Sequence, residues 1–83
     1  LFFGSLTSAT VHPREVVKAA FAVNAGGAVL FHNHPSGNIL PSEADKRITK
    51  RLEEVLDMVD VRVLDHVIVG GVNHYSFAEY GLI

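Results

Sequence analysis

Residues 28–45 read AVLFHNHPSGNILPSEAD, and this stretch predicts a buried strand, a turn and the start of a helix. Residues 28–31 form a short apolar run with turn residues before it, which is typical of a buried strand. The cluster at residues 35–38, Pro-Ser-Gly-Asn, predicts that the chain reverses there. Ser42 then predicts the start of a helix, with Asp45 in its first turn.

Two imidazoles lie at the end of the expected strand, and a carboxylate lies in the first turn of the expected helix. The pattern is His32-x-His34, seven residues, Ser42, two residues and Asp45. Residues i and i+2 of a strand point the same way, so His32 and His34 leave the strand end on one side. Imidazole and carboxylate are the usual ligands of a catalytic zinc, which lowers the pKa of a bound water to about 7. We therefore expect His32, His34 and Asp45 to bind Zn²⁺, with the Ser42 hydroxyl beside a metal-bound oxygen.

A simpler interpretation exists for the same residues. Ser42-x-x-Asp45 also fits a capping box, and these four residues alone are better explained as a helix cap. Two histidines at i and i+2 are likewise common as polar strand ends. Their combination within 14 residues favours the metal site. One hydroxyl can serve both purposes, because it donates outward while it accepts from the backbone.

The rest of the chain alternates between strand and helix patterns. The second helix has one continuous apolar stripe, formed by Ile48, Leu52, Val55, Leu56 and Val59. The first helix has an apolar face, formed by Val16, Val17, Ala20 and Phe21. Residues 61–70 are apolar on both sides, which predicts a strand covered by helices. The expected elements are a strand tail at 1–6, a polar connection at 7–11, helix 13–24, the central unit, strand 61–70 and a short returning strand at 74–77. This order predicts one α/β domain over residues 1–83, a mixed, partly antiparallel sheet flanked by helices.

The remaining histidines allow several interpretations. Asp65 and His66 are adjacent and could form a carboxylate–imidazole pair that supports a metal ligand. A core histidine that bonds the backbone is the favoured alternative, because His66 lies in an apolar strand. We expect His12 to flank the first helix and His74 to be exposed.

Composition narrows the function classes. The chain has 83 residues, no cysteine and a formal net charge of −2. The charge gives no clear nucleic-acid surface, and the missing cysteines exclude a thiol nucleophile and a Cys-ligated zinc site. No apolar run approaches the roughly 20 residues of a membrane span, and a cytoplasmic location is the default without disulfides. A domain this small buries only about 60% of its unfolded surface, so a metal or an oligomer could add stability.

The central pattern resembles the JAMM (MPN+) metalloprotease motif, and its flanks resemble the RadC family of bacterial proteins. The matching stretches are residues 12–17 (HPREVV), 32–37 (HNHPSG), 41–42 (PS), 64–70 (LDHVIVG), 76–77 (SF) and 81–82 (GL). The resemblance implies a layered fold similar to that of cytidine deaminases. It implies His32, His34 and Asp45 as zinc ligands, Ser42 as the catalytic residue that stabilises a tetrahedral intermediate, and a peptide or protein substrate.

The resemblance also implies a general-base glutamate upstream of residues 1–5. The chain starts after that place and with Leu1 rather than Met, so we interpret it as N-terminally truncated. General acid–base catalysis is worth roughly 100- to 10,000-fold, so we expect this piece alone to be nearly inactive. None of its five glutamates fits that place; they are Glu15, Glu43, Glu53, Glu54 and Glu79.

Three functions therefore compete at this point. The first is a zinc-dependent peptidase or isopeptidase. The second is a metal-binding scaffold without catalysis, which the missing glutamate keeps open. The third, a DNA-repair factor, is suggested by the family's historical name alone, and a salt-dependent affinity for DNA would distinguish it.

Overall fold

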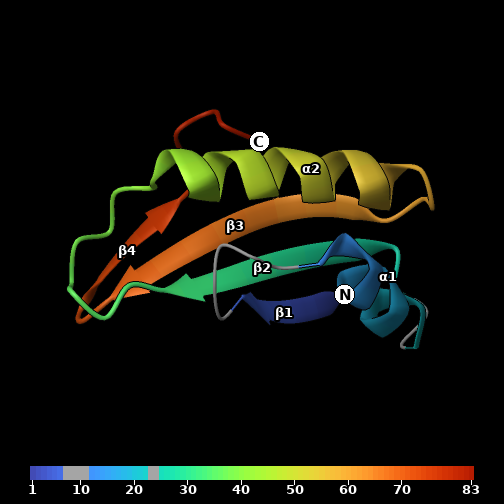
Figure 1. Cartoon of the computed structure of the whole chain (residues 1–83), viewed down its shortest axis with the longest axis horizontal. Helices are drawn as coiled ribbons and strands as arrows, with labels where there is room; N and C mark the ends of the chain where they lie inside the picture. The colour runs from blue at the N-terminus through green and yellow to red at the C-terminus, as the bar shows by residue number, and fades with distance from the viewer. Residues whose placement is uncertain (7–11, 23–24) are drawn as a thin grey trace.

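The computed structural model describes residues 1–6, 12–22 and 25–83, which form one mixed sheet and two helices. The strands lie in the order β1-β2-β3-β4, with β1, β2 and β3 parallel and β4 antiparallel to β3. This confirms the expected mixed, partly antiparallel α/β arrangement (Figure 1). The elements are β1 (Phe2–Leu6), α1 (Pro13–Ala22), β2 (Gly27–Asn33), α2 (Glu43–Asp57), β3 (Arg62–Gly70) and β4 (Asn73–Ser76).

Both helices pack on the same face of the sheet. Because the parallel strands follow chain order, successive right-handed crossovers place their helices on one side. The core cluster joins both helices to that face; it contains Leu6, Val16, Ala20, Ala28, Leu30, Ile48, Leu52, Leu56, Val61 and Val63. The expectation that helices cover both sides of β3 is therefore wrong for the described residues. On the other side of β3, Val67 and Val69 are only half-buried.

Helix α1 begins at Pro13, as predicted, and buries Val16 and Ala20 against the core. Phe21, which we expected on the same face, is 57% exposed. The reason is geometric, since a residue five positions after Val16 lies roughly 140° around the helix axis. The expected end of this helix at residue 24, and the connection at residues 7–11, lie outside the described residues.

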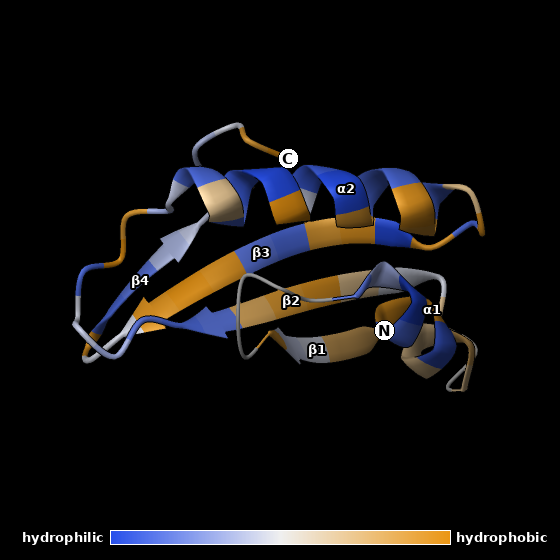
Figure 2. Ribbon diagram, in the orientation of Figure 1, coloured by the Kyte–Doolittle hydropathy of each residue, from blue (hydrophilic) through white to orange (hydrophobic). Residues whose placement is uncertain are grey.

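Helix α2 confirms the predicted apolar stripe. Leu52 and Leu56 are fully buried and Ile48 nearly so, while Val55 and Val59 border the stripe and are half-buried. Figure 2 shows the apolar residues of α2 on the side that faces β3. Within the described ranges, no helix combines the length and the apolar character needed to cross a lipid bilayer.

A bulge in β3 changes which side chains reach the core. Ala28 of β2 pairs with Val63, but the next residue, Val29, pairs with Asp65, so Leu64 is an extra residue in β3. A bulge of this kind reverses the alternation of side chains that follow it. His66 therefore faces the helices, opposite Leu30, and is fully buried.

Candidate metal centre

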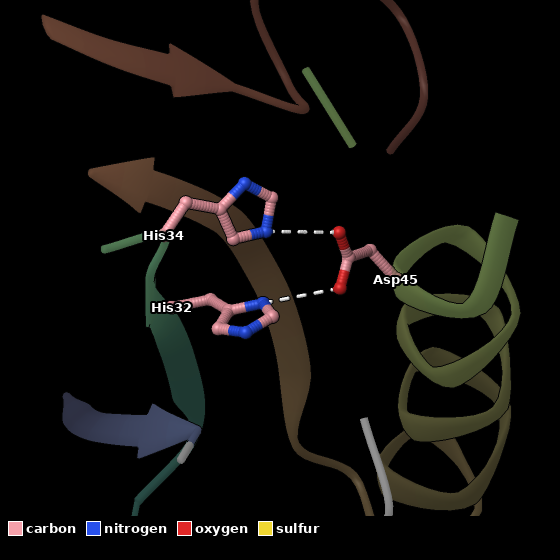
Figure 3. Close-up of side chains that lie close together, drawn as sticks. All are labelled: His32, His34 and Asp45. Atoms are coloured by element: carbon pink, nitrogen blue, oxygen red, sulfur yellow. Dashed lines mark hydrogen bonds and ion pairs between the residues drawn. The ribbon is translucent and has the colours of Figure 1, made fainter. Parts of the chain in front are cut away.

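The structure brings His32, His34 and Asp45 together, as the sequence predicted. His32 lies near the end of β2, His34 directly follows the strand, and Asp45 lies in the first turn of α2. One ligand atom from each lies within 4.8 Å of the others, so the group could hold a metal ion (Figure 3). The centroids of the two imidazole rings are 4.7 Å apart, and the rings meet edge to face.

The Asp45 carboxylate points between the two rings. Its Oδ1 is 3.1 Å from Nδ1 of His32 and its Oδ2 is 3.1 Å from Nε2 of His34. The Asp45 residue is 2% exposed. Burial alone would raise its pKa, but the backbone and side-chain hydrogen bonds from Ser42, with His32 and His34, outweigh burial and lower that pKa. Asp45 is therefore a carboxylate at neutral pH, as a metal ligand must be.

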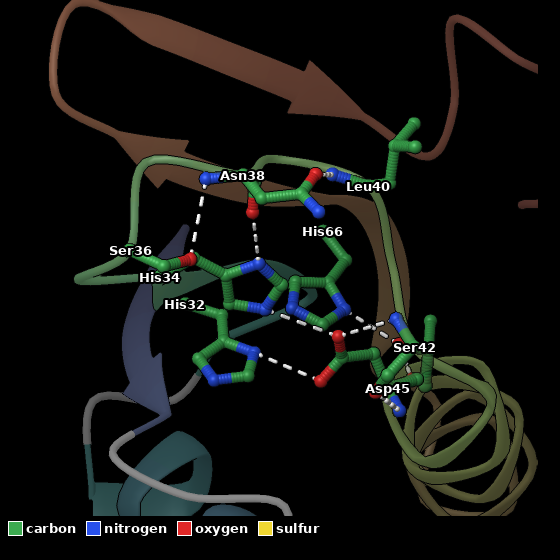
Figure 4. Close-up of polar contacts among 9 residues, drawn as sticks. His32, His34, Ser36, Asn38, Leu40, Ser42, Asp45 and His66 are labelled. Carbon is green, nitrogen blue, oxygen red and sulfur yellow. Dashed lines mark hydrogen bonds and ion pairs between the residues drawn. The ribbon is translucent and has the colours of Figure 1, made fainter.

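His34 is held in one tautomer by the turn that follows it. Its Nδ1 lies 2.7 Å from the carbonyl oxygen of Asn38 (Figure 4). A carbonyl oxygen only accepts, so Nδ1 carries the hydrogen, and in the neutral ring Nε2 has a bare lone pair. That lone pair faces Oδ2 of Asp45 at 3.1 Å. Two acceptors this close need a cation between them, either a proton or a metal ion.

The contact between His32 and Asp45 also calls for a cation between the two groups. Its Nδ1 is buried and has no hydrogen-bond partner, although Oδ1 of Asp45 is 3.1 Å away. The contact has the distance of an ion pair without the geometry of a hydrogen bond. Buried polar atoms are usually paired, so an exception requires an explanation. A metal ion bound by both imidazoles and the carboxylate fits these donors.

Ser42 is the N-cap of α2, and its capping box is complete. Its Oγ accepts from the Asp45 amide at 3.0 Å, and its own amide donates to Oδ2 of Asp45 at 2.8 Å. The cap and the metal group therefore share one carboxylate, so the two interpretations of this motif are compatible. Capping uses a lone pair of the Ser42 oxygen, so the hydroxyl hydrogen can be donated to the Asp45 carboxylate or to another acceptor at the site.

His66 is a buried core histidine, as the favoured interpretation predicted, but its ring has neither of the expected partners. Asp65 does not bind the His66 ring; its carboxylate accepts from the His66 backbone amide at 2.7 Å and from Oγ of Ser76 at 2.6 Å. The ring does not bond the backbone either, because its Nδ1 lies 2.5 Å from Oγ1 of Thr49. His74, by contrast, is exposed as predicted.

Sequence reasoning missed two contributors to this site. The Asn38 carbonyl is a backbone group, and the sequence indicated only a turn at that place. Thr49 did carry a signal, because it is a polar residue beside the apolar stripe and follows Asp45 by one helical turn.

Comparison with known proteins agrees with the geometry. The sequence model of the family described as RadC-like JAB domain matches residues 1–82. Over all 83 residues the chain is 60% identical to the UPF0758 protein YfjY and 58% identical to the UPF0758 protein YkfG, both of Escherichia coli (strain K12). It is also 58% identical to the UPF0758 protein PSHAa2643 of Pseudoalteromonas translucida (strain TAC 125). The chain spans 52%, 52% and 37% of these three relatives, which is about half of their length or less.

Proposed function

This chain belongs to the RadC-like JAB domain family, and from that premise we propose that it carries the metal-binding part of a zinc-dependent hydrolase of the JAMM type. The observation that supports the proposal is the buried Asp45 carboxylate, held 3.1 Å from a ring nitrogen of His32 and from a ring nitrogen of His34, where the His32 nitrogen is buried and has no hydrogen-bond partner. This donor set suits zinc, which accepts imidazole and carboxylate ligands.

In this proposal His32, His34 and Asp45 hold the zinc ion. When bound, zinc would polarise a scissile carbonyl and supply an activated water. The protein's part is to keep the ligands in place: the Asn38 carbonyl holds the tautomer of His34, and the Ser42 amide holds Asp45. The Ser42 hydroxyl would donate its hydrogen to the oxygen that becomes negative when a peptide or isopeptide carbonyl is attacked.

A general base is not part of this group. Of the described residues, the metal group contains two histidines and one aspartate but no glutamate. We propose that the base comes from outside these 83 residues, since the relatives are about twice as long or longer. The same observation supports a second candidate, a metal-binding scaffold without catalysis. A peptidase assay on a protein of the relatives' full length that contains this domain separates the two candidates.

Zinc stoichiometry is the direct test of the proposed centre. The parent should bind one zinc ion per chain, and His34→Ala should bind none. His74→Ala is the matched control, because it removes an exposed imidazole from β4 and should bind zinc like the parent. A folded parent without zinc at micromolar concentrations of the metal would contradict the proposal, as would equal loss of zinc in the two variants.

A further inference from the structure

His66 is a buried imidazole beside the metal group that the proposed chemistry does not use. Its ring stacks on Phe77, with the centroids 4.6 Å apart and the planes 15° apart. The ring of His32 is also near-parallel to the His66 ring, with the centroids 6.1 Å apart and the planes 20° apart. His66 is fully buried. The His66 ring is therefore near-parallel both to Phe77 and to His32, which is a proposed metal ligand.

The backbone around His66 is fixed from the neighbouring turn. The Asp65 carboxylate accepts from the His66 amide at 2.7 Å, from Oγ of Ser76 at 2.6 Å and from the Ala78 amide at 3.0 Å. The Phe77 amide donates to the His66 carbonyl at 3.0 Å. Asp65 thus ties β3 to the end of β4, and this arrangement keeps Phe77 against the imidazole.

The hydroxyl of Thr49 sets the tautomer of the His66 ring. Its Oγ1 is 2.7 Å from the Asp45 carbonyl, which can only accept, so the hydroxyl hydrogen is used there. Nδ1 of His66 lies 2.5 Å from the same oxygen and must therefore carry the hydrogen of that bond. Burial, with smaller contributions from the charges of neighbouring groups, lowers the pKa of His66 to about 4, so the ring is neutral at pH 7. Its Nε2 then has a bare lone pair, which is buried and has no partner among the described residues.

We propose that His66 and Thr49 are positioning residues of the metal centre: the Nδ1–H···Oγ1 bond joins β3 to α2 one turn after Asp45, and it fixes the His66 ring near His32. The proposal rests on the metal-binding function proposed above. The bond links the two elements that must stay in register, because the imidazole ligands belong to the sheet and the carboxylate ligand belongs to α2. Groups that hold metal ligands in orientation typically change metal affinity about 10- to 100-fold when they are removed.

The test compares Thr49→Val, which keeps the shape and removes the hydroxyl, with Thr49→Ser, which keeps the hydroxyl. Zinc affinity, measured by competition with a chelating dye, should fall about 10- to 100-fold in Thr49→Val and should stay near the parent value in Thr49→Ser. Ile48→Val controls for loss of core packing, because it trims a buried residue of the same helix and should not change zinc affinity.

A second readout does not depend on metal. In the zinc-free protein, ¹⁵N NMR of the imidazole should show the Nδ1–H tautomer of His66 in the parent and in Thr49→Ser. Thr49→Val should lose that preference. If Thr49→Val does not fold, His66→Asn and His66→Leu replace it, since only the asparagine amide can donate to Thr49 as Nδ1 does; zinc affinity should be retained better in His66→Asn.

The outcomes separate the two proposals. A parent that binds no zinc would overturn the metal centre and this role together. If Thr49→Val binds zinc as tightly as the parent, only the positioning role would be overturned. The same holds if the His66 ring of the parent is the Nε2–H tautomer. Equal losses in Thr49→Val and Ile48→Val would also overturn it, because they would reduce the effect to general packing.

Discussion

Gly37 and Gly70 pack backbone against backbone beside the metal group. A Cβ atom on Gly70 would lie 3.1 Å from the Cα, the carbonyl carbon and the carbonyl oxygen of Gly37. Gly37 itself has a φ of 84°, a conformation that glycine adopts without strain. The next residue, Asn38, supplies the carbonyl that fixes the tautomer of His34. The contact between the two glycines therefore places a turn whose backbone controls a proposed metal ligand.

Gly70→Ala should weaken zinc binding about tenfold, in the range for loss of a group that orients a ligand. The added methyl group would push the turn at Gly37 by a few tenths of an ångström and lengthen the bond from His34 to Asn38. Gly26→Ala is the control, because a Cβ there would meet nothing within 4 Å. Isothermal titration with zinc gives both affinities. Equal affinity in parent and Gly70→Ala would show that the turn does not tune the site.

Asp45→Asn should separate function from stability. The asparagine oxygen can take the place of Oδ2 and still accept from the Ser42 amide, and its amide group then takes the place of Oδ1 and can donate to Nδ1 of His32. Where neither a proton nor a metal ion lies between the Asp45 carboxylate and the ring nitrogens, this change removes the unfavourable contact between the carboxylate and the ring lone pairs. We therefore expect zinc affinity to fall at least about 100-fold, because the charged ligand is lost, while the zinc-free protein stays as stable as the parent or gains up to about 1 kcal/mol.

Urea unfolding in the presence of a chelator measures that stability. A loss of more than about 2 kcal/mol in Asp45→Asn would indicate that the carboxylate serves mainly to stabilise the fold. In that case the unfavourable contact between the Asp45 carboxylate and the ring lone pairs, which supports the metal proposal, would be absent.

The strand, the turn and the helix that carry the site could be predicted because each has a local signal. Period-two alternation places His32 and His34 on one side of β2, and the Ser42 cap fixes where α2 begins. These two local facts, together with the turn between them, bring Asp45 to the imidazoles. The prediction of the group therefore needed no knowledge of the rest of the sheet.

What could not be predicted depends on contacts between distant elements. The bulge at Leu64 arises from the pairing of β3 with β2, and without it His66 would face the open side of the sheet. Alternation in the sequence alone does not locate an extra residue of this kind. The role of Asn38 is a backbone role, so its side chain carries no signal of it. The uncovered face of β3 likewise follows from strand order, which is a property of the assembled sheet.

The buried His66 should make the stability of the zinc-free protein depend on pH. Its pKa is lowered to about 4 in the folded state, chiefly by burial, from the ordinary 6.5. Between these values the unfolded chain binds the proton and the folded chain does not, so stability falls as the pH falls from about 6.5 to about 4. The shift corresponds to at most about 3 kcal/mol. Chemical unfolding between pH 4.5 and 7.5 measures how the free energy of unfolding changes with pH. This free energy should rise more steeply with pH in the parent than in His66→Gln. Equal slopes in the two proteins would contradict the buried neutral ring.

Replacing Ser42 should distinguish its cap from its proposed chemistry. Ser42→Ala removes the N-cap acceptor and should cost about 1 kcal/mol of stability, whereas glycine at an N-cap costs only a few tenths of a kcal/mol. Both variants lack the hydroxyl, and both keep the three zinc ligands. We therefore expect both to bind zinc like the parent.

The catalytic comparison uses a protein of the relatives' full length that contains this domain. Loss of one donor to a developing oxyanion costs about 100- to 1,000-fold in kcat, so Ser42→Ala and Ser42→Gly should lose peptidase activity equally despite their different stabilities. If Ser42→Gly hydrolyses peptide as fast as the parent, the hydroxyl serves only as the cap of α2. If activity follows stability instead, with Ser42→Ala the slower variant, the effect comes from fraying of the first turn that carries Asp45.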